Sequence, residues 1–117
     1  MLQSIQDASL GDDVYREDEA VNELQDYAAK LLDKEAALFF PSGTQSNLSA
    51  MLSHCQRGDE VLIGKSYHTN LYEARGVSVL GGVGICPIET SASGSMNVED
   101  MLIQIKDDDP HLSLIHI

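Results

Sequence analysis

Ser42, Gly43 and Thr44 lie between an apolar run and a segment with helical spacing, a position that suits anion binding. If the run is a strand and the segment a helix, the first helical turn has backbone amides without intrahelical partners at its positive end. Such amides favour phosphate or carboxylate; Gly43 allows close approach of the backbone, and the two hydroxyls can add hydrogen bonds. The alternative is an ordinary turn in which Ser42 or Thr44 only caps the helix.

His68 is the second candidate, because it follows the next expected strand, residues 60–63. In a parallel sheet the loops at the carboxyl ends of the strands open at one edge, where α/β proteins usually bind ligands. We therefore expect His68 and the turn 42–44 to face one pocket. A histidine there can lie flat on an aromatic cofactor or transfer a proton near neutral pH. The alternative is a surface or capping histidine.

Asp12 and Asp13 are adjacent carboxylates ahead of the first expected helix. They can bind a cation, hydrogen-bond within a turn, or be solvated. A turn is favoured, because a metal site needs further ligands at defined spacing and no His or Cys lies near. We expect no metal.

The elements that position these residues begin with an amphipathic helix capped by Asp18. Its apolar positions recur at spacings of three and four: Ala20, Val21, Leu24, Tyr27, Ala28, Leu31 and Leu32. The continuous apolar run Ala36–Phe40, closed by Pro41, predicts a strand buried on both faces.

Helices and strands alternate along the rest of the chain. A second helix is marked by Leu48, Met51, Leu52 and Cys55 and is ended by Gly58. There follow a strand at 60–63, a short helix at about 69–75, a β-branched segment at 77–80, a strand at 84–88, and a helix capped by Asn97 that carries Val98, Met101, Leu102 and Ile105. This alternation predicts an α/β fold with a parallel sheet covered by helices.

The composition limits the classes of partner. With 117 residues and 43% hydrophobic content, the chain is long enough for one modest folded domain. The net charge of −12 disfavours nucleic acid and anionic membrane surfaces. We find neither an apolar run of roughly 20 residues nor a basic leader. Cys55 and Cys86 are isolated, which is typical of reduced, buried thiols, so we expect a cytoplasmic protein.

Several blocks in order and at matching spacing resemble the threonine aldolase family, through nearly the whole chain to about His111. The blocks are Gly11-Asp12-Asp13-Val14-Tyr15, Asp18, Val21, Leu24, Lys34-Glu35-Ala36-Ala37, Pro41-Ser42-Gly43-Thr44-Gln45-Ser46-Asn47, Leu52-Ser53-His54-Cys55, Arg57-Gly58 and His68.

This resemblance implies the large domain of a fold-type I pyridoxal 5'-phosphate enzyme, with three layers and a mostly parallel sheet, here only in part. It implies a homotetramer that cleaves L-threonine or L-allo-threonine to glycine and acetaldehyde. Gly43 and Thr44 would hold the cofactor phosphate, and His68 would stack on the pyridine ring and serve catalysis. Tyr15 and Tyr72 would line the pocket or the edge of a neighbouring subunit.

The chain also departs from the family pattern. The family has a Ser-Asp-Thr segment ahead of the position of Met1. Its cofactor-bearing lysine, the acidic partner of the pyridine nitrogen and the substrate-binding arginines lie further downstream. None of Lys30, Lys34, Lys65 and Lys106 matches that lysine. We therefore expect an N-terminal fragment that is inactive by itself.

We expect three segments: an arm and amphipathic helix at 1–34, the first part of the cofactor-binding domain at 35–111, and a tail at 112–117. The tail Leu-Ser-Leu-Ile-His-Ile equals a translation of the transposon mosaic-end DNA used in sequencing libraries. We expect it to be non-native; the alternative is a natural strand that happens to match.

Two other functions stay open on the sequence alone. The first is another fold-type I enzyme, such as a β-eliminating amino-acid lyase, because such relatives share the phosphate turn and a ring-stacking residue. The second is a non-catalytic anion-binding domain that needs the turn but no lysine.

Overall fold

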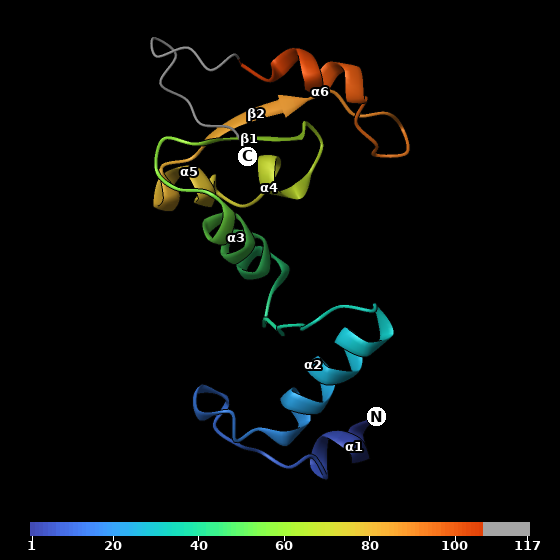
Figure 1. Cartoon of the computed structure of the whole chain (residues 1–117). Helices are drawn as coiled ribbons and strands as arrows, with labels where there is room; N and C mark the ends of the chain where they lie inside the picture. Colours follow the sequence, from blue (N-terminus) through green and yellow to red (C-terminus); the bar gives the residue numbers. More distant parts are fainter. Residues whose placement is uncertain (107–117) are drawn as a thin grey trace. The chain divides into compact units, whose positions relative to one another are not determined.

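The computed structural model describes residues 1–106. Its helices and strands follow one another in the order α1 (Leu2–Gln6), η1 (Asp13–Tyr15, a 3-10 helix), α2 (Glu19–Leu31), α3 (Gly43–His54), β1 (Glu60–Gly64), α4 (His68–Leu71), α5 (Gly76–Gly81), β2 (Gly84–Ile88) and α6 (Val98–Gln104), as Figure 1 shows. The suspected non-native tail at 112–117 lies outside the described residues.

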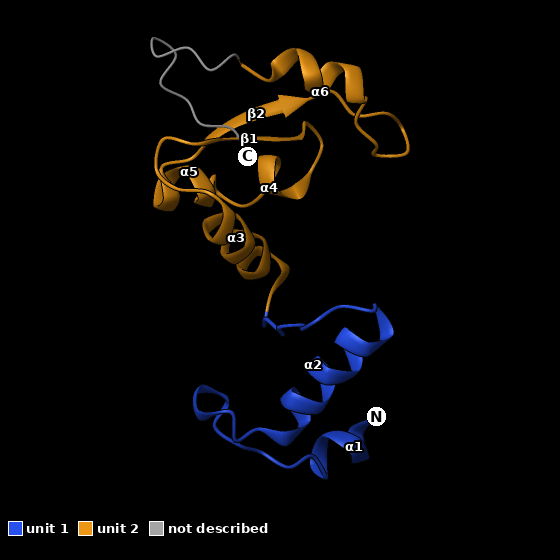
Figure 2. Cartoon of the chain, in the orientation of Figure 1, with its two compact units in different colours: residues 1–41 blue, residues 42–117 orange. Residues whose placement is uncertain are grey.

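The chain divides into two compact units, coloured separately in Figure 2. Unit 1 is Met1–Pro41 and holds α1, η1 and α2, while unit 2 begins at Ser42 and holds the sheet and the remaining helices. The division that we expected from the sequence, at residue 34, stays a prediction.

Helix α2 confirms the first predicted helix and its cap. Asp18 has an extended backbone, and its side chain accepts a hydrogen bond from Val21 N at 3.0 Å. Glu19 in the first turn and Lys30 in the last turn complement the helix dipole.

The predicted strand Ala36–Phe40 is wrong, since these residues form no regular element. Leu38 and Phe39 are 70% and 51% exposed, so the segment is not buried on both faces either. A strand needs a neighbour for its backbone groups. Here the Phe39 amide donates instead to Gln25 Oε1 of α2, at 2.9 Å.

Unit 2 contains the predicted parallel sheet in a two-stranded form. β1 pairs with β2 in parallel, from Glu60 opposite Gly84 to Gly64 opposite Ile88. The crossover between them carries α4 and α5, as a parallel pair requires. α5 and α6 both contact β2, and in Figure 1 α6 lies on the opposite side of the strands from α3 and α5. The prediction of an α/β fold with helices around a parallel sheet is confirmed at this level.

The core of unit 2 forms around Cys55, Val77 and Val83, all buried. Four partly buried side chains pack against it: Leu48, Met51, Val61 and Ile85. The β-branched segment at 77–80 is helical, within α5, although its composition favours a strand. Arg75 and Gly82, both with left-handed backbones, bound this short helix and turn Val77 into the core.

Two further boundaries refine the sequence analysis. α3 ends at His54, with Cys55 at its C-cap, so Gly58 does not end that helix. Gly58 instead has φ +98° in the turn before β1 and donates to the Gly82 carbonyl. The final helix is confirmed, with the Asn97 side chain accepting from Glu99 N at 2.8 Å.

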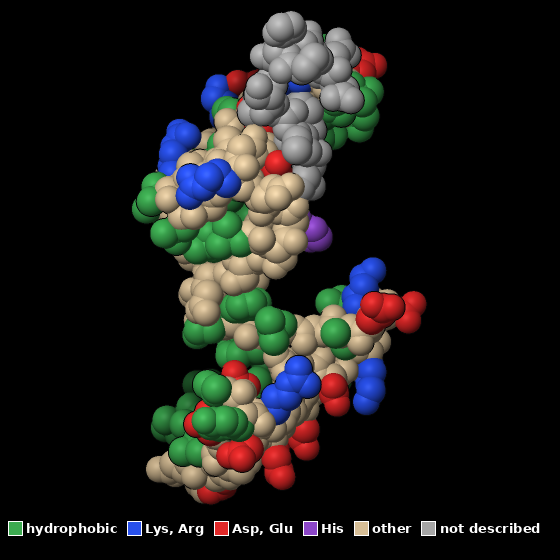
Figure 3. Space-filling view, turned by 60° about the vertical axis from the view of Figure 1, so that its left-hand side comes forward, with side chains coloured by type: hydrophobic (Ala, Val, Ile, Leu, Met, Phe, Trp, Pro, Cys, Tyr) green, Lys and Arg blue, Asp and Glu red, His purple; other side chains and the backbone are tan. Residues whose placement is uncertain are grey.

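Both units carry exposed apolar side chains, visible in Figure 3. Leu24 of α2 is 48% exposed and Leu52 of α3 is 42% exposed.

Of the two thiols, Cys55 is buried as expected, whereas Cys86 is only partly buried.

Candidate functional site

The turn at 42–44 is the junction that starts α3. Ser42 is extended, and its hydroxyl accepts from Gln45 N at 3.2 Å while its carbonyl accepts from Ser46 N at 3.1 Å. Ser42 therefore acts as the N-cap, which was the alternative interpretation of this residue. These two hydrogen bonds satisfy the amides of Gln45 and Ser46, but not those of Gly43 and Thr44.

Those two amides belong to Gly43 and Thr44, which are exposed. Within residues 1–106 neither amide donates to a protein acceptor. A Cβ placed on Gly43 would meet no atom within 4 Å, so the protein leaves that space empty. Open amides at the positive end of a twelve-residue helix, with the Thr44 hydroxyl beside them, form a donor set that suits a phosphate group.

His68 begins α4, and its side chain is 60% exposed. Its Nδ1 lies 2.9 Å from Glu73 Oε1. The ring centroid lies 5.2 Å from that of Tyr72, with the planes tilted by 45°. One edge of the imidazole is thus held by the protein, and much of the ring remains accessible.

Glu73 is a site residue that the sequence analysis missed. Its side chain is only 4% exposed, and its Oε1 also accepts from Asn47 Nδ2 at 2.7 Å. Asn47 lies on α3, one turn after Gly43. A single carboxylate oxygen therefore connects α3, the helix that starts at the turn, with His68 at the start of α4.

The signal for Glu73 in the sequence is weak. It lies five positions after His68 in a segment that we expected to be a short helix, and this spacing does not indicate a buried carboxylate. Asn47 was part of the quoted turn block, yet its partner, 26 positions away, is visible only in three dimensions.

The structure brings only some of the predicted site residues together. His68 and Tyr72 are in contact, and His68 is connected to α3 through Glu73 and Asn47. Tyr15 lies on η1 of unit 1 and is 74% exposed, so its role at a pocket or subunit edge stays a prediction. A pocket shared by Gly43, Thr44 and His68 also stays a prediction.

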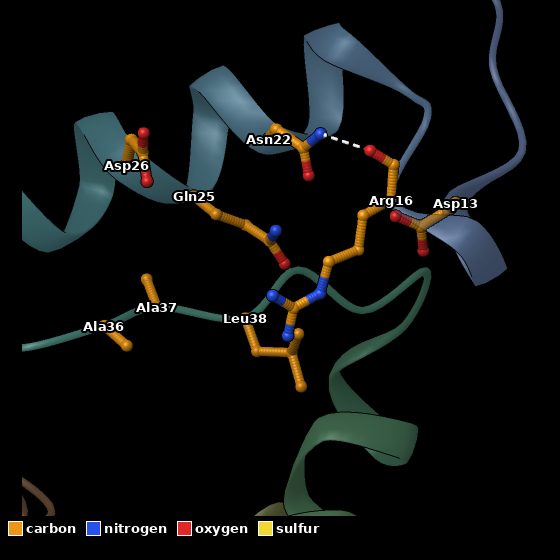
Figure 4. Close-up of a pocket in the computed structure, with 8 residues that line it drawn as sticks. All are labelled: Asp13, Arg16, Asn22, Gln25, Asp26, Ala36, Ala37 and Leu38. Carbon is orange, nitrogen blue, oxygen red and sulfur yellow. Dashed lines mark hydrogen bonds between the residues drawn. The ribbon is translucent and has the colours of Figure 1, made fainter.

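A hollow lies elsewhere, inside unit 1 (Figure 4). It has a volume of about 520 Å³ and is lined by Asp13, Arg16, Asn22, Gln25, Asp26, Ala36, Ala37 and Leu38. The Arg16 side chain extends toward Leu38, and Asn22 Nδ2 donates to the Arg16 carbonyl at 2.9 Å. Gly43, Thr44, His68, Tyr15 and Tyr72 are not among the residues that line this hollow.

The acidic pair forms the turn that was predicted. Asp12 caps η1, and its Oδ1 accepts from Val14 N at 3.0 Å. Among residues 1–106, no three His, Cys, Asp or Glu side chains are grouped closely enough to bind a metal ion. Over the same residues, no helix has the length and apolar character needed to cross a membrane.

Two of the lysines are engaged with carboxylates. Lys65 pairs with Glu89, and Lys106 Nζ lies 2.7 Å from Glu60 Oε2. Lys30 and Lys34 lie in unit 1, at the end of α2 and just beyond it.

Comparison with known proteins gives a consistent result. The model of the beta-eliminating lyase family matches residues 1–117. Over 113 residues the chain is 49% identical to the low specificity L-threonine aldolase of Escherichia coli (strain K12), which covers 97% of this chain and 34% of that protein. It is 38% identical over 108 residues to low-specificity L-threonine aldolase 1 of Arabidopsis thaliana, covering 92% of this chain and 30% of that protein.

A relative with a different name also matches. Over 104 residues the chain is 33% identical to alanine racemase TOXG of Cochliobolus carbonum, covering 86% of this chain and 26% of that protein. The chain thus spans about a third, or less, of the length of these curated relatives. The resemblance to threonine aldolases that the sequence indicated is confirmed.

Proposed function

The chain belongs to the beta-eliminating lyase family, and we propose that it forms the phosphate-binding part of a pyridoxal-phosphate enzyme that cleaves L-threonine or L-allo-threonine to glycine and acetaldehyde. The observation that carries this proposal is the open N-terminus of α3 in a chain 49% identical to a low specificity L-threonine aldolase. The family is pyridoxal-phosphate dependent, and the donor set at Gly43 and Thr44 fits the phosphate of that cofactor.

In this proposal the turn at the start of α3 binds the phosphate. The amides of Gly43 and Thr44 and the Thr44 hydroxyl donate to its oxygens, and the α3 dipole adds a favourable field. Ser42 holds the helix start through its hydrogen bond from Gln45 N. Because none of these groups must move to donate, the turn is ready for an anion.

His68 provides the second contact with the cofactor. Its ring would pack on the pyridine ring, and Nε2 would accept a proton near the substrate hydroxyl. When bound, pyridoxal phosphate supplies the electron sink for cleavage next to the amino group. Tyr72, whose ring lies beside that of His68, would line the same region. For Tyr15, the role at the pocket or at a subunit edge rests on the family resemblance alone.

We place this chain within a larger three-layer, mostly parallel fold-type I domain. The parallel pair of β1 and β2, with helices on both sides of the strands, supports this assignment. The exposed apolar side chains of Leu24 and Leu52 support further packing, and a homotetramer is the proposed assembly. The net charge of −12 disfavours nucleic acid and anionic membrane surfaces, and the proposed partner is a small amino acid. The two isolated cysteines support a cytoplasmic location.

The second candidate reaction is β-elimination, because the matched family carries that description. The turn of α3 suits either reaction, since holding the phosphate does not select the bond that breaks. The two functions differ in product: aldol cleavage of threonine yields acetaldehyde and glycine, whereas elimination yields ammonia and a 2-oxo acid.

The test is a product analysis of the gene product that carries this chain, loaded with pyridoxal phosphate and given L-threonine or L-allo-threonine. We expect acetaldehyde and glycine in equal amounts. Ammonia and a 2-oxo acid without acetaldehyde would refute the aldolase proposal. The 117-residue chain alone is the control, and it should release no acetaldehyde because none of its four lysines matches the cofactor-bearing lysine.

A further inference from the structure

We propose that Glu73 is a positioning residue that fixes the tautomer of His68 and connects it to the phosphate-binding helix α3. The inference rests on the proposed function only for the role of His68 at the cofactor. The hydrogen bonds that carry it are features of the chain itself.

The Glu73 side chain is 4% exposed, although it lies in the loop between α4 and α5, where a carboxylate ordinarily extends into water. A buried carboxylate is costly unless donors satisfy it. Asn47 Nδ2 and His68 Nδ1 both lie within hydrogen-bond distance of its Oε1, at 2.7 and 2.9 Å.

The contact with Glu73 determines which nitrogen of His68 carries the proton. A carboxylate oxygen only accepts, so the imidazole nitrogen facing Glu73 must carry the hydrogen. Nδ1–H then donates to Oε1, and in the neutral ring Nε2 is left without a proton. Nε2 is therefore the nitrogen that can accept a proton from a ligand, and the side chain is 60% exposed.

Asn47 connects Glu73 to α3. Asn47 is one turn from Gly43, so the same oxygen that orients His68 is bonded to the helix whose first amides are open. The orientation of the imidazole and the position of the phosphate turn are thereby coupled through one side chain. A carboxylate shorter by one methylene could not reach both partners.

The test is the tautomer of His68, read from two-bond nitrogen–proton correlations of the nitrogen-15-labelled 117-residue chain without cofactor. The spectra are recorded above the range in which an ordinary histidine titrates, about pH 6.5. His54 is the internal reference, because it is exposed and no hydrogen bond of its side chain occurs within residues 1–106. A His68→Gln variant assigns the signal.

We expect Nδ1–H at His68 and predominantly Nε2–H at His54. Glu73→Gln keeps an oxygen acceptor on a side chain of the same length, so the Nδ1–H tautomer of His68 should remain the major one. Glu73→Asp keeps the charge but has a side chain too short to contact Nδ1, so His68 should change to the predominantly Nε2–H tautomer expected for His54. Glu89→Gln, at the exposed partner of Lys65, is the matched control and should change nothing.

The positioning role is overturned if His68 has the same tautomer as His54 in the unaltered chain, whatever the cause. It is equally overturned if Glu73→Asp retains Nδ1–H or Glu73→Gln abolishes it. Because no cofactor is present, this result is separate from the product analysis. Acetaldehyde release with Nε2–H at His68 would refute only the positioning role, and Nδ1–H without acetaldehyde would refute only the proposed function.

Discussion

Cys55 and Cys86 show how the local environment of a residue sets its chemistry. Burial, followed by the charge of Asp59, raises the pKa of the Cys55 thiol above its ordinary value of 9.0. Burial also raises the pKa of Cys86, with Glu60 adding to the effect and Lys106 opposing it. Both thiols therefore stay protonated through neutral pH, which is typical of structural cysteines.

This predicts slow and unequal alkylation of the folded chain. At about pH 8 both thiols should react more slowly with iodoacetamide than in the urea-unfolded chain, because the thiolate is the reactive form. Cys55, 8% exposed, should be the slower of the two, whereas Cys86 is only partly buried. Site-resolved mass spectrometry measures both rates, and equal rates in folded and unfolded chains would contradict the burial of Cys55.

The same shift has a consequence for stability. The folded chain holds the Cys55 proton more tightly than the unfolded chain does. The resulting contribution to the free energy of unfolding is fully present below the pKa that the thiol has in the unfolded chain. This contribution is lost as the pH rises through the pKa of the folded chain, because the thiol of the unfolded chain ionises at lower pH than that of the folded chain.

The open amides at the start of α3 were predictable from the sequence, because a turn before a helix leaves its first amides without intrahelical partners in any fold of this kind. The role of Gly43 and Thr44 at the cofactor phosphate stays a prediction. The hydrogen bond of Glu73 to Asn47 joins positions 26 apart, so residue type and spacing could not show it. A charged residue in a loop is read as solvated unless its distant partner is known.

Helix α2 is the element whose start is defined most completely. Asp18 accepts from Val21 N through Oδ1 and from Gly11 N through Oδ2, at 3.0 and 3.3 Å. Gly11 passes so close to Glu17 that an added Cβ would lie 2.1 Å from the Glu17 carbonyl oxygen. The Asp18 side chain thus holds both the first turn of α2 and the segment at Gly11 that leads into it.

Asp18→Ala is therefore expected to fray the first turn of α2. Loss of an N-cap costs about 1 kcal/mol, which corresponds to about a fivefold increase in local opening. Amide hydrogen exchange of Asn22, whose amide donates to the Asp18 carbonyl, measures it. Asp26→Ala removes a carboxylate from the middle of the same helix and is the matched control. An equal effect of the two variants would contradict the capping role.

The elements also show where a sequence pattern fails. Caps and periodic spacing predicted α2, α3 and α6, because those signals act within one or two turns of the chain. The apolar run Ala36–Phe40 was expected to be a strand, yet it forms no regular element, and the Phe39 amide donates to the Gln25 side chain of α2 instead. A strand depends on a neighbouring strand, which the run itself cannot provide.

At the scale of the whole molecule, the chain combines a small core with much exposed apolar surface. The buried core of unit 2 centres on Cys55, Val77 and Val83, while side chains such as Leu71 and Leu102 remain 52% and 60% exposed. Apolar exposure of this extent marks surfaces that pack against other protein. It fits a chain that spans about a third of the length of its relatives.

The central claim is that the start of α3 holds the cofactor phosphate, and the affinity of the gene product for pyridoxal phosphate tests it most directly. Thr44→Val removes the hydroxyl but keeps the side-chain shape, so the dissociation constant should rise by about tenfold, the effect of a charge-assisted hydrogen bond of about 1.5 kcal/mol. Thr69→Val, on α4 and outside the turn, is the matched control and should leave the affinity unchanged. An unchanged affinity in Thr44→Val, or an equal loss in both variants, would contradict the account.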